Sequence, residues 1–328
     1  MLKQVVFVGT SISALHGHGK LIPKVFFPVF KRELEAAGFK FFSYWTVERF
    51  AVAYSEHAGA RVVAIYNEEQ RPDSDAIYAE VGRLAALCRE IGAELIQGPE
   101  TGRLVASKPE ANRTLSRIIP MPRVVKAGTA FSAAPFGSGK PVKTLDASDP
   151  EAAGRFNTEL IDTVHEFDGV SYYVCLRALT VGPIVTSIFA RCRPVVEQSR
   201  SVHSKNTPLD PVLLNRLHQE LVLPSRKRIE TICQKASKAL DKGFYAYDIL
   251  PERGTGKLYV CELGYKVHDD TIYRHLEPIS AELSYFEDAL GEPLLERTSR
   301  AFIDLYCRDH EDQSARTSAD GARSLSAR

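Results

Sequence analysis

The sequence predicts a mixed α/β protein in which a doubly wound parallel sheet is followed by antiparallel sheets and helices. Two observations support this fold class. Strand-like and helix-like segments alternate over residues 1–105, which is typical of a parallel sheet covered by helices. Beyond that point, two pairs of strand-like segments lie close together in the sequence, as in antiparallel hairpins. With 328 residues, the chain is long enough for about two domains.

The first third of the chain contains four strand-like segments. Residues 3–8 (KQVVFV) form a continuous apolar run that ends at Gly9-Thr10-Ser11, as a buried parallel strand does. The two helical patterns each stop at a glycine, which is the usual end signal of a helix. The remaining predicted strands are 39–44, 61–66 and 94–97, and the predicted helices are 29–37 and 75–91.

The second part of the chain has the signals of two hairpins and a helix between them. The first hairpin, 171–191, turns at Gly182, and the second, 244–263, turns near Gly254. In the helix 225–242, Ser225 is suited to cap the first turn. We expect this second domain to cover residues 106–307, and we expect the Ser-, Ala- and Arg-rich residues 308–328 to be a disordered tail.

Composition excludes several classes of protein. The 42 Lys and Arg residues balance 41 Asp and Glu residues, and 44% of the residues are apolar. This balance indicates neither a nucleic-acid-wrapping surface nor a disordered chain. No apolar run approaches the length of a membrane span, and no signal peptide precedes the first strand. The six cysteines are scattered singly, which favours a reducing, cytoplasmic setting over a disulfide framework.

Two acidic residues lie on the second predicted hairpin. Because Asp248 and Glu262 are both even-numbered, an even-sum register puts their side chains on one face. A turn near Gly254 would make the two residues diagonal neighbours, roughly 6–8 Å apart. Two carboxylates at this distance can share a divalent cation with the phosphate oxygens of a substrate. The alternative is that both acids lie on a solvated face of the hairpin.

Basic residues on the first hairpin and before a small-residue loop could hold phosphate groups. Arg177 and Arg191 share a face of their hairpin by the same parity, and guanidinium groups bind polyphosphate through paired hydrogen bonds. Lys126 ends a short strand and precedes the Gly-, Ser- and Ala-rich residues 127–140, which could cradle phosphate through backbone N–H groups. The alternative for this segment is a flexible surface loop.

The order of these features resembles the ATP-grasp superfamily over roughly residues 1–300. The features are Lys108 at a helix start, the step IIPMP at 118–122, the strand ending at Lys126, the segment 157–161, and the two hairpins. The resemblance implies an ATP-grasp module behind an N-terminal α/β domain. It also implies an ATP- and Mg²⁺-dependent ligase that activates a carboxylate as an acyl-phosphate for attack by an amine.

The resemblance further implies roles for residues that match the superfamily pattern. Lys108 and Lys126 resemble the lysines that contact ATP phosphates. Arg177 and Arg191 resemble the arginines that face the transferred phosphate and the acyl-phosphate. The residues implied to hold adenine and ribose are Glu159, Leu160 and Ile161.

The resemblance also implies that Asp248 and Glu262 are the magnesium ligands. Two departures accompany this match: Gly264 stands where the superfamily usually has Asn, and only 17 residues separate Lys108 from Lys126. The residues near Gly264 that could replace the missing ligand are Lys266, His268, Asp269 and Asp270.

Other functions stay open at this stage. The same scaffold can be a kinase for a hydroxyl group, or a nucleotide-binding protein with a degenerate catalytic site. A dinucleotide oxidoreductase is disfavoured because no G-x-G-x-x-G follows the first strand. The expected partners are small-molecule or peptide substrates, with no nucleic acid and no membrane, and the oligomeric state is either a monomer or a homodimer.

Overall fold

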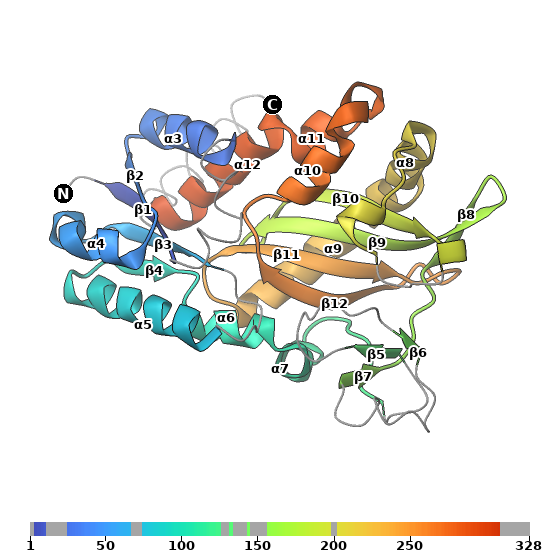
Figure 1. Ribbon diagram of the computed structural model, residues 1–328, viewed down its shortest axis with the longest axis horizontal. Coiled ribbons are helices and arrows are strands. Elements are labelled where there is room, and N and C mark those ends of the chain that lie inside the picture. The colour runs from blue at the N-terminus through green and yellow to red at the C-terminus, as the bar shows by residue number, and fades with distance from the viewer. Residues whose placement is uncertain are drawn as a thin grey trace, which may run out of the picture.

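The computed structural model describes residues 3–10, 25–66, 74–125, 131–133, 143–144, 156–197 and 202–308. Within these ranges the strands form a four-stranded, a five-stranded and a three-stranded sheet. The two larger sheets lie side by side, and the small sheet lies beyond α7 (Figure 1). The predicted tail lies outside the described residues except for Arg308. Every helix in the described ranges is too short or too polar to cross a lipid bilayer.

The N-terminal sheet is parallel, with the strand order β2-β1-β3-β4. From the central strand β1 the chain moves to the edge strand β2 and then returns across the sheet to β3, so the predicted doubly wound sheet is confirmed. The long apolar run of β1 is buried because helices cover the sheet. The strands are β1 (Gln4–Gly9), β2 (Lys40–Tyr44), β3 (Arg61–Ile65) and β4 (Glu94–Ile96).

The second large sheet is antiparallel, with the order β10-β9-β11-β12 and β8 paired to β9. Both predicted hairpins are present in it, β9 with β10 and β11 with β12. The strands are β8 (Val164–Phe167), β9 (Val170–Val181), β10 (Ile184–Pro194), β11 (Phe244–Pro251) and β12 (Leu258–Tyr265). The small sheet consists of β5 (Phe131–Ala133), β6 (Lys143–Thr144) and β7 (Phe156–Thr158).

Helices surround the two larger sheets, and α9 lies behind the antiparallel sheet in Figure 1. The α-helices are α3 (Phe27–Ala36), α4 (Val47–Ala53), α5 (Ser74–Glu90), α6 (Pro99–Ala106), α7 (Lys108–Leu115), α8 (Pro211–Leu217), α9 (Leu223–Ala236), α10 (Asp270–Leu276), α11 (Phe286–Leu290) and α12 (Glu292–Phe302). Shorter 3-10 or π turns are Tyr54–His57, Val195–Glu197, Ser204–Asn206, His218–Val222, Ser237–Ala239, Glu277–Glu282 and Ile303–Cys307.

The predicted cap at Ser225 is wrong. Helix α9 begins at Leu223 and follows directly on the π turn His218–Val222, so the chain is already helical before Ser225 is reached. Ser225 is therefore buried inside the first turn of α9 and does not cap it. The α-helix also ends earlier than predicted, at Ala236, because the 3-10 turn Ser237–Ala239 closes it.

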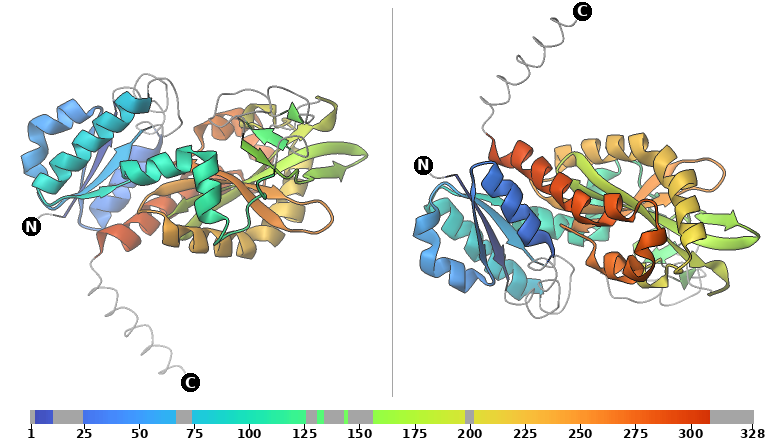
Figure 2. Two further views of the ribbon diagram at one scale, coloured as in Figure 1. Left: turned by 90° about the horizontal axis from the view of Figure 1, so that it is seen from below. Right: turned by 90° about the horizontal axis from the view of Figure 1, so that it is seen from above.

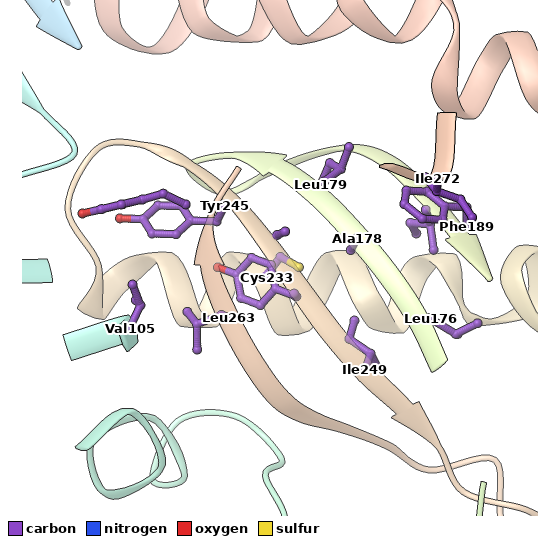
Figure 3. Packing of buried hydrophobic residues seen from close by; sticks show 14 of the residues in the cluster. Val105, Leu176, Ala178, Leu179, Phe189, Cys233, Tyr245, Ile249, Leu263 and Ile272 are labelled. Carbon is purple, nitrogen blue, oxygen red and sulfur yellow. The ribbon is translucent and has the colours of Figure 1, made fainter. Parts of the chain in front are cut away.

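The antiparallel sheet buries one face against α9. Figure 3 shows Cys233 of α9 among side chains of the sheet such as Tyr245, Ile249 and Leu263. All four side chains are buried. This apolar face fixes the sheet on the helix, so polar side chains of β9, β11 and β12 that alternate with it are directed to the opposite face.

A second apolar cluster joins the two large sheets to the C-terminal helix. Phe244, at the start of β11, stacks on Phe302 of α12 with ring centroids 5.3 Å apart, and Phe7 of β1 is 6.3 Å from Phe244. On the outside, Arg32 of α3 binds Glu292 and Glu296 of α12 at 2.7 Å each. Helix α12 thus contacts α3, which covers the parallel sheet, and the strands β9 and β10 of the antiparallel sheet (Figure 2). The division into domains 1–105 and 106–307 stays a prediction.

Candidate active site

The two acidic residues of the second hairpin lie directly opposite each other. Asp248 of β11 pairs in register with Glu262 of β12, and on its other side Asp248 pairs with Arg177 of β9. The three residues thus form one row across the sheet. The predicted shared face is confirmed, but the predicted diagonal placement is wrong, because a bulge at Cys261 shifts the register of β12.

Asp248 is held by both arginines of the first hairpin. Its Oδ1 accepts from Nε of Arg177 at 2.7 Å and from Nη2 of Arg191 at 2.8 Å, and its Oδ2 accepts from Nη2 of Arg177 at 2.9 Å. The Asp248 side chain is only 17% exposed, whereas that of Glu262 is 43% exposed. The solvated-face alternative therefore does not apply to Asp248, which lies in a charge cluster with Arg177 and Arg191.

The charges in this cluster stabilise one another. Burial alone would raise the pKa of Asp248, but Arg177 and Arg191 outweigh it and hold that pKa well below its usual range. Burial would lower the pKa of each arginine, and the nearby Asp248 raises it instead. Among the described residues, the Nε of Arg191 has no hydrogen-bond partner although it is buried. The cluster thus retains one buried donor that a bound anion could accept from.

A third buried carboxylate completes the cluster, and sequence reasoning did not single it out. Asp269 is 0% exposed, and its Oδ2 accepts from Nη1 of Arg177 at 2.5 Å. Its Oδ1 lies 3.7 Å from the Nζ of Lys266. Asp269 was one of four residues near Gly264 that the sequence could not rank, because only the folded chain brings the segment after β12 next to β9.

Lys108 lies at the open end of the row. As the first residue of α7, it places its Nζ 3.2 Å from a carboxylate oxygen of Glu262. Burial alone would lower the pKa of Lys108, but Glu262, Cys261 and Asp248 together outweigh this effect and the pKa is raised. The chain after α7 then runs along β12, where the N–H of Val260 donates to the carbonyl of Pro120 at 2.9 Å. This contact holds α7 beside the acids.

The three residues predicted to hold adenine and ribose lie beyond the Pro-x-Pro step. The carboxylate of Glu159 accepts from the backbone N–H of Arg123 at 3.0 Å and from its Nε at 2.7 Å. These bonds outweigh burial and lower the pKa of Glu159. Leu160 is 42% exposed and Ile161 is buried. Lys126 lies outside the described residues, so its predicted phosphate contact is not tested.

The acids can be compared with what magnesium requires. Within the described ranges, no three His, Cys, Asp or Glu side chains gather to hold a metal ion. A magnesium ion that arrives with nucleotide phosphates needs only one or two protein carboxylates. Glu262 meets this requirement, because it is partly exposed and, in the part of the chain that the structure describes, its ion pair is with Lys108 alone. Asp248 already binds both arginines, so an oxygen that it gave to the ion would be shared with a guanidinium group.

Comparisons with known proteins define the fold. A RiPP-associated ATP-grasp ligase from Chryseobacterium gregarium, solved with ADP and a leader and core peptide, is similar with a TM-score of 0.50 and 11% identity, over 93% of this chain and 97% of that chain. An ATP-grasp superfamily protein from Archaeoglobus fulgidus is similar over 90% and 88% of the two chains, with a TM-score of 0.49 and 13% identity. No family model and no curated protein matches the sequence. The chain has the ATP-grasp fold.

Proposed function

We propose that this protein is an ATP-dependent ligase that joins a carboxylate to an amine. The observation that carries the proposal is the charged row formed by Glu262, Asp248 and Arg177 on the ATP-grasp sheet. Arg191, Lys108 and Lys266 add cations to this row. These four cations outnumber the three acids of the cluster, Asp248, Glu262 and Asp269, which suits a substrate that brings its own negative charge, such as a nucleoside triphosphate.

The proposed reaction has two steps, and neither needs a covalent nucleophile from the protein. A carboxylate oxygen of the substrate attacks the γ-phosphorus of ATP, and the bond to the ADP oxygen breaks, which gives an acyl-phosphate. The amine nitrogen then attacks the acyl carbon, loses a proton and displaces inorganic phosphate. In both steps negative charge develops on phosphoryl oxygens, so fixed cations can lower the barrier.

The proposed roles of the cations follow their positions. Arg177 and Arg191 remain charged in the buried cluster and would stabilise the transferred phosphoryl group and the acyl-phosphate. Lys108, at the open end of the row, would contact the ATP phosphates together with Lys126. The residues proposed to hold the adenine and ribose are Glu159, Leu160 and Ile161.

We treat magnesium as part of the nucleotide substrate, MgATP. Bound there, the ion would neutralise charge on the phosphates, with Glu262 as its first protein ligand. Asp248 is the proposed second ligand, and in this proposal one arginine contact passes from Asp248 to a phosphate oxygen. Such an exchange keeps every charge paired, because the guanidinium moves from a carboxylate to a phosphate.

The acceptor and donor of the ligation are proposed to be amino acids, peptides or other small molecules. The peptide complex of the Chryseobacterium gregarium ligase supports the inclusion of peptides. A second function, nucleotide binding without ligation, is favoured by two observations. Gly264 supplies no side-chain ligand two residues after Glu262, and Asp248 is already paired with two arginines.

An ADP-release screen tests the proposal. Purified protein with MgATP would be incubated with amino acids, short peptides and organic acids, each with and without an added amine, and ADP would be measured. We expect ADP only where a carboxylate is present, and a condensed product only where the amine is also present. ADP release that follows a hydroxyl compound without a carboxylate would indicate a kinase. Nucleotide binding without any ADP release would favour the binding protein.

A further inference from the structure

Asp269 is the one acid of the cluster that no bound molecule could reach directly. It lies between β12 and α10 and is 0% exposed. Both of its oxygens are used within the protein. Oδ2 accepts from Arg177, and Oδ1 faces Lys266 and the backbone N–H of Ile272. Asp269 could therefore affect a bound molecule only through the residues that it contacts, as outer groups orient the ligands of a metal site.

The position of Asp269 is itself fixed by the backbone. Asp269 caps α10, with its Oδ1 3.4 Å from the N–H of Ile272 and its carbonyl accepting from Tyr273 at 3.1 Å. The side chain therefore has little freedom to rotate, and the oxygen that it presents to Arg177 stays in place.

Arg177 therefore donates hydrogen bonds to two different carboxylates. Its Nε and Nη2 donate to Asp248, and its Nη1 donates to Asp269. Asp248 is shared with Arg191, so Asp269 is the acid that binds Arg177 and not Arg191. Arg177 is thus held by carboxylates on two segments, β11 and the segment after β12, so its contact with Asp269 remains when a contact with Asp248 loosens.

We infer that Asp269 is a positioning residue, which holds Arg177 and Lys266 in the orientation that a nucleotide phosphate requires. This inference rests on the proposed function, in which the cluster binds MgATP. Asp269 keeps Arg177 in place while the bonds of Asp248 change on binding. The charge of Asp269 is therefore needed for tight binding, although Asp269 makes no contact with the nucleotide.

The test uses Asp269→Asn in the full chain, with Asp210→Asn as the matched control. Asparagine keeps the size of the side chain and is also a good helix cap, so the change removes the charge and spares α10. Asp210 is likewise the N-cap of a helix, α8, where its Oδ1 accepts from the N–H groups of Val212 and Leu213. Three quantities are measured. The NMR signal of the Arg177 Nε–H, assigned with Arg177→Lys, gives its chemical shift and its hydrogen-exchange rate, and calorimetry gives the Kd of MgATP.

We expect faster exchange at the Arg177 Nε–H in Asp269→Asn, and a roughly tenfold weaker Kd, the size of one hydrogen bond to a charged group. Asp210→Asn should match the wild type in both. An unchanged Arg177 signal overturns the inference, and so does a changed signal with an unchanged Kd. If the wild type does not bind MgATP, the proposed function fails. The role of Asp269 in positioning Arg177 fails as well only if the Arg177 signal is the same in Asp269→Asn and the wild type.

Lys266→Met is a second variant that tests the inference if Asp269→Asn does not fold. Lys266 pairs with Oδ1 of Asp269 and Arg177 binds Oδ2, so its replacement leaves the contacts of Arg177 in place. We expect weaker MgATP binding and a lower melting temperature, because the buried carboxylate of Asp269 loses one of its two cationic partners. A Kd equal to that of the wild type would contradict the role given to Asp269 in holding Lys266.

Discussion

Single residues of the charge cluster differ in what they can contribute to stability. Asp248 lies largely away from water and compensates two guanidinium groups. Removal of one partner from a buried ion pair leaves an uncompensated charge, which is far more costly than the loss of an exposed pair. The pair of Lys108 with Glu262 is more exposed, so it contributes less to the free energy of unfolding than the pairs of Asp248 do. Its importance is expected in binding.

Asp248→Asn should destabilise the protein by about 3–5 kcal/mol at pH 7, because Arg191 loses its carboxylate partner. The folded-state pKa of Asp248 lies below its ordinary value. The stabilisation is therefore complete above the unfolded pKa of about 3.9 and is lost as the pH falls below it. Urea unfolding from pH 3 to 7 checks this: the difference between wild type and variant should be constant above pH 5 and shrink below about pH 4.

A matched control is Asp288→Asn, whose side chain is 65% exposed and pairs with Arg297. We expect this change to cost less than about 1 kcal/mol at every pH. A difference for Asp248→Asn that does not depend on pH would show that its carboxylate is not the source of the stabilisation.

The residue types of the site could be predicted from the sequence, and their partners could not. Parity placed Asp248 and Glu262 on one face, and likewise Arg177 and Arg191, because side chains alternate along any strand. No local pattern could show that β9 lies next to β11, since that neighbour relation spans about seventy residues of the chain. The bonds of Asp248 to the arginines depend on it.

At the scale of elements, Gln97 connects the two large sheets. Its Nε2 donates to the carbonyl of Ala64 at 2.9 Å, and its Oε1 accepts from the N–H of Phe244 at 3.1 Å. Its own N–H donates to the carbonyl of Lys242 at 3.0 Å. The predicted strand 94–97 therefore ends one residue early, because Gln97 takes a φ of 66° to make these contacts. Such a tertiary contact has no signature in sequence periodicity.

Gln97→Ala should destabilise the protein by about 2–4 kcal/mol, because two buried backbone groups lose their hydrogen-bond partners. Alanine keeps the left-handed φ and its strain, so no relief offsets the loss. The control is Gln219→Ala, at an exposed position of the π turn, where a change within about 0.5 kcal/mol is expected. Urea unfolding at pH 7 compares the two variants, and equal effects would contradict the role of Gln97.

At the scale of the whole molecule, the parallel and antiparallel sheets share an apolar core. Phe244 and Phe302 are fully buried and stacked, and Phe7 of the N-terminal sheet belongs to the same cluster. The sequence indicated buried positions in each element separately. It could not show that α12 packs near the N-terminal sheet. The apolar face of an amphipathic helix shows that the face is buried, but not which surface buries it.

This shared core predicts that the two sheets unfold together. The single tryptophan, Trp45, follows β2 and reports on the N-terminal sheet by fluorescence, while far-UV circular dichroism reports on all elements. We expect coincident urea transitions by both probes. Phe302→Ala should lower the free energy of unfolding by about 3–5 kcal/mol, and both transitions should move together to lower urea concentration. Val52→Ala, at an 89% exposed position, should shift neither. A separate Trp45 transition would contradict a common core.

The central claim is that the charge cluster on the antiparallel sheet binds MgATP. Calorimetric titration of MgATP into the wild type and Glu262→Gln tests it most directly, because the change removes one charge at nearly constant volume from a side chain that is 43% exposed. We predict binding to the wild type, at least tenfold weaker binding to the variant, about 1.4 kcal/mol, and equal melting temperatures without nucleotide. No binding to the wild type, or equal affinity for both proteins, would contradict the claim.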